Sequence, residues 1–341
     1  MRLVSKMHAG RMTILLASAC CWMLATGTPA TAAKYVKFAV SGATQTIPVS
    51  IDATSDIAGT WYDSNYVPHG FLRTSDGTIT AFDPTGSTQT YVYGLNDNQW
   101  VVGSFQDSNG THGFVRAADG TITVYDAPGS VGYTEIFAIN DSNDFAGSYS
   151  ASDGNDYGFV INKKGKFKSF GVTGARYTMA TAINGGGVAA GQSIVDGGPT
   201  RGFVRTAAGA ITSFDVSGGD EPYVFGINQH GSVGGTSFEY PDSNSGQGYI
   251  RRSDGTIAAL QVVSGYETDG GGINVHNDMC GDYYDASGHY HGYIRKGGGN
   301  IITIDVDSTG ATACRAINDS GQATGYYYDA KNVGRSFLRM P

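Results

Sequence analysis

Short runs of aromatic and β-branched residues, separated by glycine, asparagine, aspartate and serine, follow one another along almost the whole chain. In one stretch such runs occupy residues 133–139, 144–149, 157–162 and 166–170. Runs of this length and composition, bounded by turn residues, predict β-strands. After residue 33 no stretch shows the period of an amphipathic helix. The pattern therefore predicts an all-β protein.

The strand pattern repeats with a period of about 44 residues. An asparagine preceded by isoleucine or leucine marks each repeat, and Asp52 holds its place in the first one. These markers are Asn96, Asn140, Asn184, Asn228, Asn274 and Asn318. A glycine follows seven residues after each marker, and a Gly-aromatic-x-Arg motif comes next in most repeats. Four strands per repeat at this period predict a β-propeller with seven four-stranded antiparallel blades.

The third and fourth strands of a repeat are joined by a hairpin whose turn reads Asp-Gly at 76–77, 119–120 and 254–255. A two-residue type I′ turn centred on this pair would set two apolar residues opposite each other, and such pairs stabilise a sheet. The expected pairs are Phe71–Phe82, Phe114–Tyr125, Phe159–Phe170, Phe203–Phe214, Tyr249–Leu260 and Tyr293–Ile304.

The two ends of the repeat array complement each other. The last repeat reaches Pro341 after its third strand, and residues 38–42 match the fourth-strand sequence at 214–218. We therefore expect residues 36–40 to pair with 335–339, with Phe38 opposite Phe337, so that the N-terminal strand closes the propeller and leaves no long open edge. An open β-solenoid is the alternative, but it needs no complementary half-repeats at its ends.

Residues 1–33 differ in character from the rest. Three basic residues, Arg2, Lys6 and Arg11, precede an apolar stretch at 12–25. Small residues then lead to a cleavage position after Ala32 or Ala33. This order predicts a signal peptide over 1–33, a single propeller domain over 34–341, and a secreted or periplasmic location. The alternatives are an uncleaved anchor, for which the apolar stretch is short, and lipidation at Cys20, which lacks the usual large aliphatic residue three positions before it.

The net charge of the chain limits the kinds of molecule that it is expected to bind. The net charge is −8, and it becomes −11 without residues 1–33, which carry three basic residues and no acidic one. This balance repels a phosphate backbone, so we expect no nucleic-acid partner. No second apolar run is long enough to span a membrane. We expect a monomer.

One repeat carries the pattern in full, with Leu95-Asn96, Gly103, Asp107, Gly110 and His112-Gly113-Phe114. The pattern resembles the HAF-type extracellular repeat of exported bacterial proteins, and the resemblance covers residues 34–341. It implies export and a propeller-like fold, and it supplies no catalytic residues to carry over. The histidine before Gly-aromatic is kept at 69, 112 and 291 and is replaced by Tyr157, Arg201, Gln247 and Arg335 elsewhere.

The loops after the second and fourth strands share one face of a propeller, and here they differ strongly between repeats. Variable loops on a fixed scaffold often bind ligands, although unused loops would vary as well. Their tyrosine, aspartate and histidine side chains suit a glycan or a protein ligand, while ordinary turn chemistry is the alternative for each aspartate. The candidate ligand-binding residues are Asp63, Tyr66, His69, Asp107, His112, Tyr133, Tyr157, Asp285, Tyr290 and His291.

Other polar positions predict scaffold roles. The repeated asparagines are expected to cap the turn after the first strand. His289 and His291 with Asp285 lack a further zinc ligand, and residues 305–310 lack the carboxylate that completes a calcium loop, so we expect no metal and no cofactor. Cys280 and Cys314 occupy positions that are small or apolar in other repeats. They are expected to be buried thiols, with a disulfide as the alternative in an exported protein.

The sequence contains no catalytic motif of the G-x-S-x-G, H-E-x-x-H or G-x-x-x-x-G-K type. The expected function is therefore an exported, non-catalytic binding propeller without catalytic residues. A lectin-like propeller would instead carry near-equivalent pockets with an exposed aromatic residue. A propeller hydrolase or lyase would carry one asymmetric cluster at the central channel with a perturbed acid or histidine.

Overall fold

Each sequence repeat folds into consecutive antiparallel strands that pair in chain order. The computed structural model describes residues 33–216, 221–239, 246–307 and 310–341. The expected signal peptide therefore lies outside the described residues, apart from Ala33. The described part of the chain holds 28 strands and no helix, which confirms the all-β prediction.

The strands have these bounds: β1 (Lys34–Phe38), β2 (Gln45–Ile51), β3 (Ile57–Tyr62), β4 (Pro68–Arg73), β5 (Ile79–Phe82), β6 (Gln89–Leu95), β7 (Val101–Asp107), β8 (Gly110–Arg116), β9 (Ile122–Tyr125), β10 (Ser130–Ile139), β11 (Phe145–Ala151), β12 (Asp156–Ile161), β13 (Phe167–Phe170), β14 (Tyr177–Ile183), β15 (Ala189–Ile194), β16 (Thr200–Arg205), β17 (Ile211–Phe214), β18 (Glu221–Ile227), β19 (Val233–Phe238), β20 (Gly246–Arg251), β21 (Ile257–Leu260), β22 (Thr268–Ile273), β23 (Met279–Tyr284), β24 (Tyr290–Arg295), β25 (Ile301–Ile304), β26 (Thr312–Ile317), β27 (Ala323–Tyr328) and β28 (Gly334–Met340).

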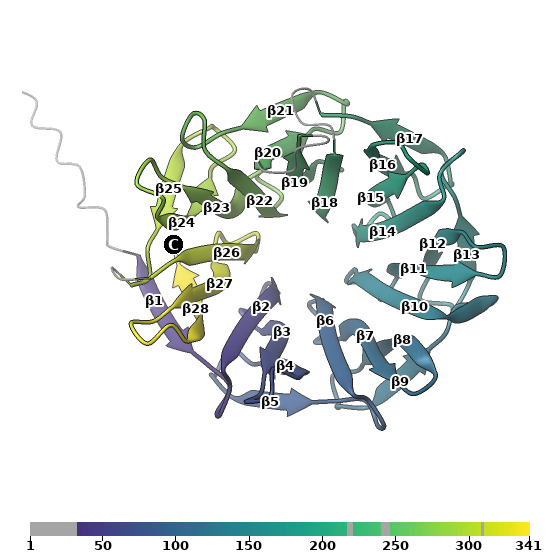
Figure 1. The fold of residues 1–341 in the computed structure, drawn as a ribbon, viewed down its shortest axis with the longest axis horizontal. Coiled ribbons are helices and arrows are strands. Elements are labelled where there is room, and N and C mark those ends of the chain that lie inside the picture. Colours follow the sequence, from purple (N-terminus) through teal and green to yellow (C-terminus); the bar gives the residue numbers. More distant parts are fainter. Residues whose placement is uncertain (1–32, 217–220, 240–245, 308–309) are drawn as a thin grey trace, which may run out of the picture. The chain divides into compact units, whose positions relative to one another are not determined.

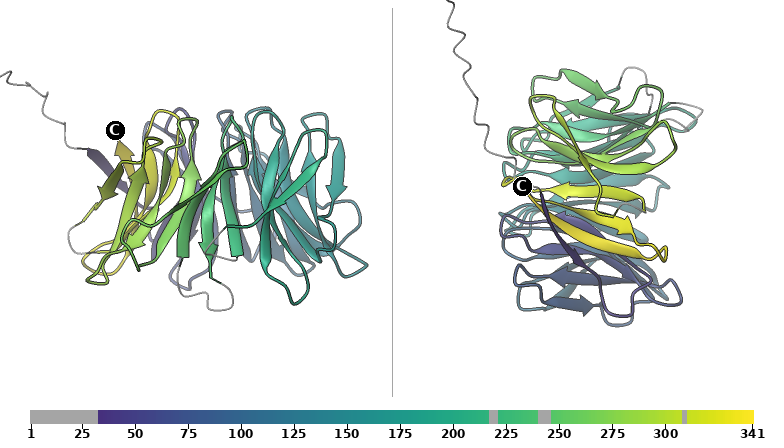
Figure 2. Two further views of the ribbon diagram at one scale, coloured as in Figure 1. Left: turned by 90° about the horizontal axis from the view of Figure 1, so that it is seen from above. Right: turned by 90° about the vertical axis from the view of Figure 1, so that its left-hand side faces the viewer.

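Within residues 33–341, the first strands of the repeats surround a common centre (Figure 1). These inner strands are β2, β6, β10, β14, β18, β22 and β26. The second, third and fourth strands of each repeat lie progressively farther out, and successive repeats stand side by side when viewed from above (Figure 2). The turns after the first and third strands therefore share one face, and the loops after the second and fourth strands share the other.

The first strand of the described chain pairs with the last. β1 is antiparallel to β28, and β2 makes a parallel contact with β28 through Gln45 and Gly334. The expected partner strand is therefore confirmed, but the expected register is wrong by one residue. Lys37 lies opposite Phe337, and Phe38 lies opposite Ser336.

The register expected for the hairpins between third and fourth strands is wrong by the same single residue. Phe71 pairs with Ala81, and Phe82 pairs with Gly70. The cause is the turn: the Gly77 amide donates to the Thr74 carbonyl at 2.8 Å, and only Gly77 has a positive φ, of 94°. This is a type I turn followed by a left-handed glycine, whereas a type I′ turn needs positive φ at both central positions. The extra loop residue turns each fourth-strand aromatic to the opposite face of its sheet.

The other five hairpins follow the same register. Phe114, Phe159, Phe203, Tyr249 and Tyr293 face Val124, Ser169, Ser213, Ala259 and Thr303, instead of the apolar partners expected from the sequence. The apolar residue at the end of each fourth strand faces the glycine of the Gly-aromatic motif. A methyl group on Gly202 would come within 2.2 Å of the Phe214 ring, so this position has no room for a side chain.

Because of this register, the fourth-strand aromatic packs over the motif glycine of its own repeat and also contacts the next repeat. The ring of Phe82 meets the buried ring of Phe114 edge-on, with 5.9 Å between centroids. Equivalent contacts join Phe38 to Phe71, Tyr125 to Phe159, Phe170 to Phe203, and Phe214 to Tyr249. The core thus lies between successive sheets, and edge-on aromatic pairs stabilise it beyond the area that they bury.

The arginine of the same motif completes each contact. The Arg116 guanidinium lies 5.1 Å from the centre of the Phe82 ring. The same stacking places Arg73 over Phe38, Arg205 over Phe170, and Arg251 over Phe214. The aromatic and the arginine of the motif therefore form a socket for the fourth-strand aromatic of the preceding repeat.

The marker asparagines join neighbouring repeats as well as capping their own turns. The Asn140 Oδ1 accepts the amides of Ser142 and Asp144, at 3.0 and 2.9 Å, as expected of a cap. Its Nδ2 donates to the carbonyl of Asn184 at 2.8 Å. The same donation to the next marker recurs from Asn96, Asn184, Asn228, Asn274 and Asn318, and the last one reaches the carbonyl of Asp52 at 2.9 Å.

The two cysteines among the described residues are buried thiols, as expected. Cys280 in β23 and Cys314 in β26 are fully buried and form no disulfide. Burial raises the pKa of the Cys314 thiol well above its usual value, so it stays protonated. We therefore assign both cysteines to the core between the last two repeats.

Phe38→Ala tests the role of the N-terminal strand. Phe38 is half-buried against Phe71 and Arg73, so its truncation should reduce the free energy of unfolding by about 2 kcal/mol, less than the cost for a fully buried phenylalanine. Lys34→Ala, which removes an exposed side chain of the same strand, is the matched control. Urea unfolding followed by tyrosine and tryptophan fluorescence measures both. Equal midpoints for the two variants would contradict a structural role for this contact.

Candidate functional site

Six of the ten candidate residues form three equivalent clusters, each of one histidine and the aspartate that precedes it. His69 lies in β4 beside Asp63, which follows β3, and beside Asp83, which follows β5. The His69 Nδ1 is 2.8 Å from Asp83 Oδ2, and the Nε2 is 4.0 Å from Asp63 Oδ2. The imidazole also stacks on Trp61, with 4.6 Å between ring centres. We call such a histidine with its two aspartates a His–Asp bracket.

The other two brackets have the same geometry. His112 Nδ1 is 2.7 Å from Asp126 and its Nε2 is 3.2 Å from Asp107. His291 Nδ1 is 2.7 Å from Asp305 and its Nε2 is 3.3 Å from Asp285. In each bracket the histidine joins the loop after the second strand to the residue after the fourth strand.

The aspartates raise the pKa of two of these histidines. Burial alone lowers the pKa of His112, but the hydrogen bonds and charges of Asp126 and Asp107 outweigh it, and the net pKa is raised. The same balance raises the pKa of His291. In return, backbone hydrogen bonds and the histidines lower the pKa of Asp107 and Asp285. The brackets are thus ion pairs when the imidazole is protonated.

Three other repeats place a different side chain beside a single aspartate. Tyr157 donates to Asp153 at 2.8 Å, Arg201 Nε lies 3.4 Å from Asp215, and Arg335 Nε lies 3.1 Å from Asp329. Both nitrogens of a bracket histidine face aspartate oxygens, so neither is free for a metal. Among the described residues no group of three or more His, Cys, Asp or Glu side chains is arranged to hold a metal ion. This recurrence indicates that the brackets fasten loops.

The three remaining tyrosines lie in different surroundings. Tyr66 is 67% exposed at the tip of the loop between β3 and β4. Tyr133 donates to Glu135 at 2.5 Å in β10, and Tyr290 donates to Asp282 of β23. The structure therefore does not bring the ten candidates into one site, and two of them donate to acids, Glu135 of the inner strand β10 and Asp282 of the second strand β23.

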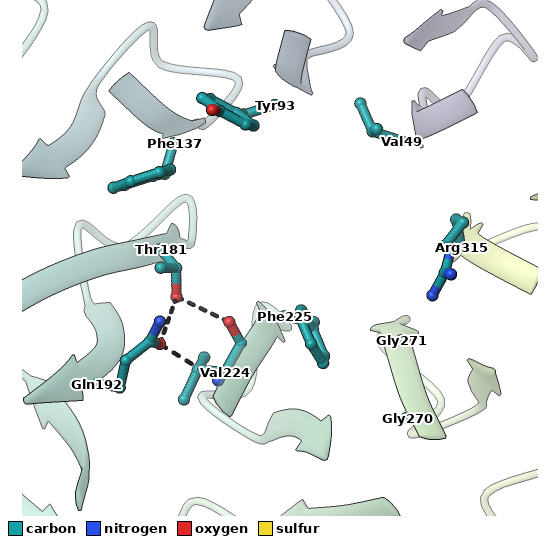
Figure 3. A pocket seen from close by; sticks show the side chains of 10 residues that line it. All are labelled: Val49, Tyr93, Phe137, Thr181, Gln192, Val224, Phe225, Gly270, Gly271 and Arg315. Atoms are coloured by element: carbon teal, nitrogen blue, oxygen red, sulfur yellow. Dashed lines mark hydrogen bonds between the residues drawn. The ribbon is translucent and has the colours of Figure 1, made fainter. Parts of the chain in front are cut away.

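A cavity of about 400 Å³ lies between the inner strands (Figure 3). At one equivalent position, each inner strand contributes a residue to it. These residues are Val49, Tyr93, Phe137, Thr181, Phe225, Gly271 and Arg315. Val224 and Gly270 of the same strands and Gln192 of β15 complete the lining, and Phe225 is 54% exposed. None of the ten candidates lines this cavity.

The cavity-lining residues occupy one structural position, three residues before each marker asparagine or Asp52. The markers barely vary between repeats, whereas this position carries valine, tyrosine, phenylalanine, threonine, glycine and arginine. A scaffold position would repeat, so its variation marks a surface that the fold leaves free. The loops differ strongly between repeats, whereas this inner-strand position varies only in residue type and is found by comparing the repeats column by column.

Arg315 is held at the cavity by Asp282, whose own carboxylate is too deeply buried to reach the cavity. Arg315 Nη1 lies 3.5 Å from Asp282 Oδ1, and Nη2 lies 3.1 Å from the Tyr326 hydroxyl. Asp282 is fully buried, and burial raises its pKa to about 7 against the opposing effects of Arg315 and Tyr290. The corresponding residue in other repeats is threonine, serine, glutamine or tyrosine. Asp282 thus positions the Arg315 guanidinium from the side that faces away from the cavity.

A second acid supports the opposite part of the lining. Glu135 Oε1 accepts hydrogen bonds from Tyr93 at 3.1 Å and from Ser104 at 3.0 Å. Burial and the nearby Glu135 charge raise the pKa of Tyr93, so the phenol remains neutral. On the far side of the cavity, Thr181 donates to the Val224 carbonyl at 2.8 Å (Figure 3). The polar lining groups are therefore held in place by their own partners.

Comparisons with solved structures show the fold alone. No family model and no curated protein sequence matches the chain. The virginiamycin B lyase of Staphylococcus aureus superposes with a TM-score of 0.57 at 13% identity, covering 91% of this chain and all of that one. A prolyl endopeptidase gives a TM-score of 0.62 at 11% identity over 87% of this chain and 48% of its own length.

A third match is a structure of YCF48 bound to D1 peptide, with a TM-score of 0.52 and 10% identity over 90% of this chain and 96% of that one. These neighbours are propeller proteins, and the chain has a β-propeller fold. It spans about half the length of the endopeptidase. No helix in the described ranges is long and apolar enough to cross a membrane.

The brackets and Asp282 predict that the protein is most stable at mildly acidic pH. The raised pKa values of His112 and His291 stabilise the fold below the unfolded value near 6.5, and this contribution is lost as the pH rises through the folded values. The raised pKa of Asp282 also makes the fold less stable as the pH rises, between about pH 4 and about pH 7. The lowered pKa values of Asp107 and Asp285 stabilise the fold above about 4, and this contribution is lost in stronger acid.

We therefore expect the free energy of unfolding to peak between about pH 4 and 6. The double substitution His112→Gln/His291→Gln should reduce the decline from pH 6 to 8 by about 0.5 kcal/mol per histidine, the scale of partly exposed ion pairs. Part of the decline should persist because Asp282 is unchanged. Urea titrations across the pH range measure the slope, and an unchanged slope in the double variant would refute the assignment.

Proposed function

We propose that the chain is an exported, non-catalytic binding protein, built as a closed propeller of seven blades. The pairing of β1 with β28 and the hydrogen bond from Asn318 to Asp52 support closure, because each joins the last repeat to the first described residues. The sequence pattern of residues 1–33 and the resemblance to HAF-type extracellular repeats support export.

The ligand site is the central cavity. One observation carries this assignment: the same structural position on each inner strand lines the cavity, and its residue type differs between repeats while the neighbouring scaffold positions recur. Seven copies of a scaffold need no such difference. A ligand that lies on the axis touches all inner strands at once and therefore favours a different residue from each.

The lining favours a peptide segment of a protein partner. Val49, Phe137 and Phe225 offer apolar and aromatic surface, which suits an apolar side chain, and Arg315 offers donors to a carbonyl or carboxylate. The half-exposed Phe225 is available to such a ligand without rearrangement of the fold. A structural neighbour, YCF48, is seen bound to a peptide, which is consistent with this class of ligand on a related fold.

Burial of Asp282 supports the non-catalytic part of the proposal. An asymmetric cluster with a perturbed acid is the feature expected of a propeller enzyme, and Asp282 with its raised pKa fits that description. Its carboxylate is, however, fully buried behind Arg315 and Tyr290. A general acid or base must come within hydrogen-bond reach of the substrate, which this residue does not.

A lectin-like function is the second candidate, and a separate cavity favours it. This cavity of about 660 Å³ lies on the loop face and is lined by Tyr284, Tyr290, His289, His291 and Asp305, among others. Tyr284 is 37% exposed, and its ring centre is 4.8 Å from that of Tyr290. Aromatic surface beside carboxylates and imidazoles is suited to a sugar ring.

Arrays of immobilised peptides and glycans probed with the purified protein distinguish the two candidates. We expect a restricted set of peptides with an apolar residue beside a carboxylate to bind. Phe225→Ser and Arg315→Gln should each weaken this binding by about tenfold or more, since each removes a central contact. Val124→Ser, which alters a half-exposed residue of an outer strand, is the matched control.

Glycan binding that survives Phe225→Ser but is lost in Tyr284→Ala would favour the lectin function. Binding to neither array, or peptide binding that Phe225→Ser and Arg315→Gln leave unchanged, would refute the central cavity as the peptide site. Thermal unfolding of each variant confirms that the fold is retained, and it separates loss of binding from loss of structure.

A further inference from the structure

The hairpin between β12 and β13 carries more positive charge than the equivalent hairpins of the other repeats. Lys163, Lys164, Lys166 and Lys168 fall within six residues, in a chain that has only nine lysines and a net charge of −8. The corresponding residues of the first repeat are Ser75, Asp76, Thr78 and Thr80. All four lysines are exposed, and none forms an ion pair with a described residue.

Arg205 of the neighbouring repeat adds a buried cation without a counter-charge. In three equivalent sockets the arginine has an aspartate three residues later, as in the pairs Arg73–Asp76, Arg116–Asp119 and Arg251–Asp254. The charge of that aspartate acts on each of the three guanidinium groups.

Arg205 has Ala208 at this place, and burial alone affects its pKa. The side chain is only 4% exposed, and its Nε has no hydrogen-bond partner among the described residues. Its Nη1 donates to the Thr206 carbonyl at 3.2 Å. Arg295 also lacks the aspartate, but it is half-buried and therefore better solvated. A buried guanidinium without an acid is costly unless an anion neutralises it.

A cavity of about 250 Å³ brings these cations together between the third and fourth repeats. Lys166, Lys168 and Arg205 line it, opposite the glycine turn 185–187. The amides of Gly185 and Gly186 already donate to Gln229 and Asn184. The glycines therefore matter because they leave the space open, where other repeats carry Asp97, Asp141 or Asp319 at the first turn position.

One acid, Asp144, also lines the cavity, but its oxygens are engaged. Oδ1 accepts the Lys163 amide at 2.7 Å, and Oδ2 accepts Asn140 Nδ2 at 3.4 Å. Three cationic side chains thus share the cavity with one hydrogen-bonded carboxylate. Positive side chains thus outnumber acidic ones in this cavity, in a chain whose net charge is −8.

We propose that this cavity binds a tetrahedral oxyanion, phosphate or sulfate, either free or carried by a polymer. Lys166 and Lys168 supply ammonium donors, and Arg205 supplies a guanidinium that is fixed by its stacking on Phe170. Charge-assisted hydrogen bonds from several such donors are the usual means of oxyanion recognition. The site lies on the face of the short turns, at a blade junction away from the central cavity, so it does not depend on the proposed peptide site.

Ala208→Asp is the sharpest test because it restores the acid that the equivalent sockets carry. It should neutralise Arg205 without harming the fold, since Asp76, Asp119 and Asp254 occupy this turn position elsewhere. Binding of inorganic phosphate, inorganic sulfate and linear polyphosphate to the full chain is measured by calorimetry at low ionic strength. We expect Ala208→Asp and Lys166→Gln/Lys168→Gln each to weaken binding by about tenfold or more.

Lys163→Gln/Lys164→Gln is the matched control, because it removes the same charge from the same hairpin but no lining residue. It should weaken binding to inorganic ions by less than threefold or so. Binding of the inorganic ions supports recognition of a free oxyanion. Binding of polyphosphate alone, if Ala208→Asp abolishes it, supports recognition of groups on a polymer. No binding of any probe, or equal losses in the two lysine double variants, would overturn the proposal.

Discussion

The insertion of an outer-strand aromatic into the neighbouring repeat is the contact on which the rest of this structure depends. Phe82 lies between the ring of Phe114 and the guanidinium of Arg116, and the same arrangement recurs for Phe38, Phe170 and Phe214. A single four-stranded sheet cannot bury both of its faces. Because the aromatic of one sheet fills a socket on the next, each repeat gains its core from its neighbour. The motif glycine is part of the same contact, since a methyl group at Gly202 would meet the Phe214 ring at 2.2 Å.

Because the contacts between repeats require particular residues, the residue type varies freely at only a few positions. Marker asparagines, motif glycines and aromatics are held by hydrogen bonds and close contacts, so they recur. The inner-strand position of Phe225 and Arg315 faces the central cavity, and its contacts with neighbouring sheets differ from repeat to repeat. Differences between equivalent positions therefore separate function from scaffold in this chain. The same reasoning applies to Arg205, whose missing acid stands out only beside Asp76, Asp119 and Asp254.

Polar groups in this protein serve two different ends. The His–Asp brackets repeat in three places and join loops across strands, whereas Tyr157 and Arg335 each contact only the aspartate of the preceding loop. Asp282 and Glu135 occur once each, and they orient Arg315 and Tyr93 at the cavity. A buried acid that positions a neighbouring group is costly to maintain. No other repeat carries an acid at the position of Asp282, which is consistent with a purpose other than folding.

Local and periodic features were determined by the sequence alone: the all-β class, the repeat, the partner strand of β1, the buried thiols, and the proximity of each histidine to its aspartate. These follow because turn residues and strand spacing act over short distances or recur at a fixed interval. The hairpin register was decided by the tertiary structure. The Asp-Gly pair suits both a two-residue turn and the longer turn that Gly77 adopts, and only contact with the next sheet selects between these two turns. The central cavity and the cluster of Lys166, Lys168 and Arg205 also required the tertiary structure, because residues far apart in the chain meet there only when the sheets assemble around one centre.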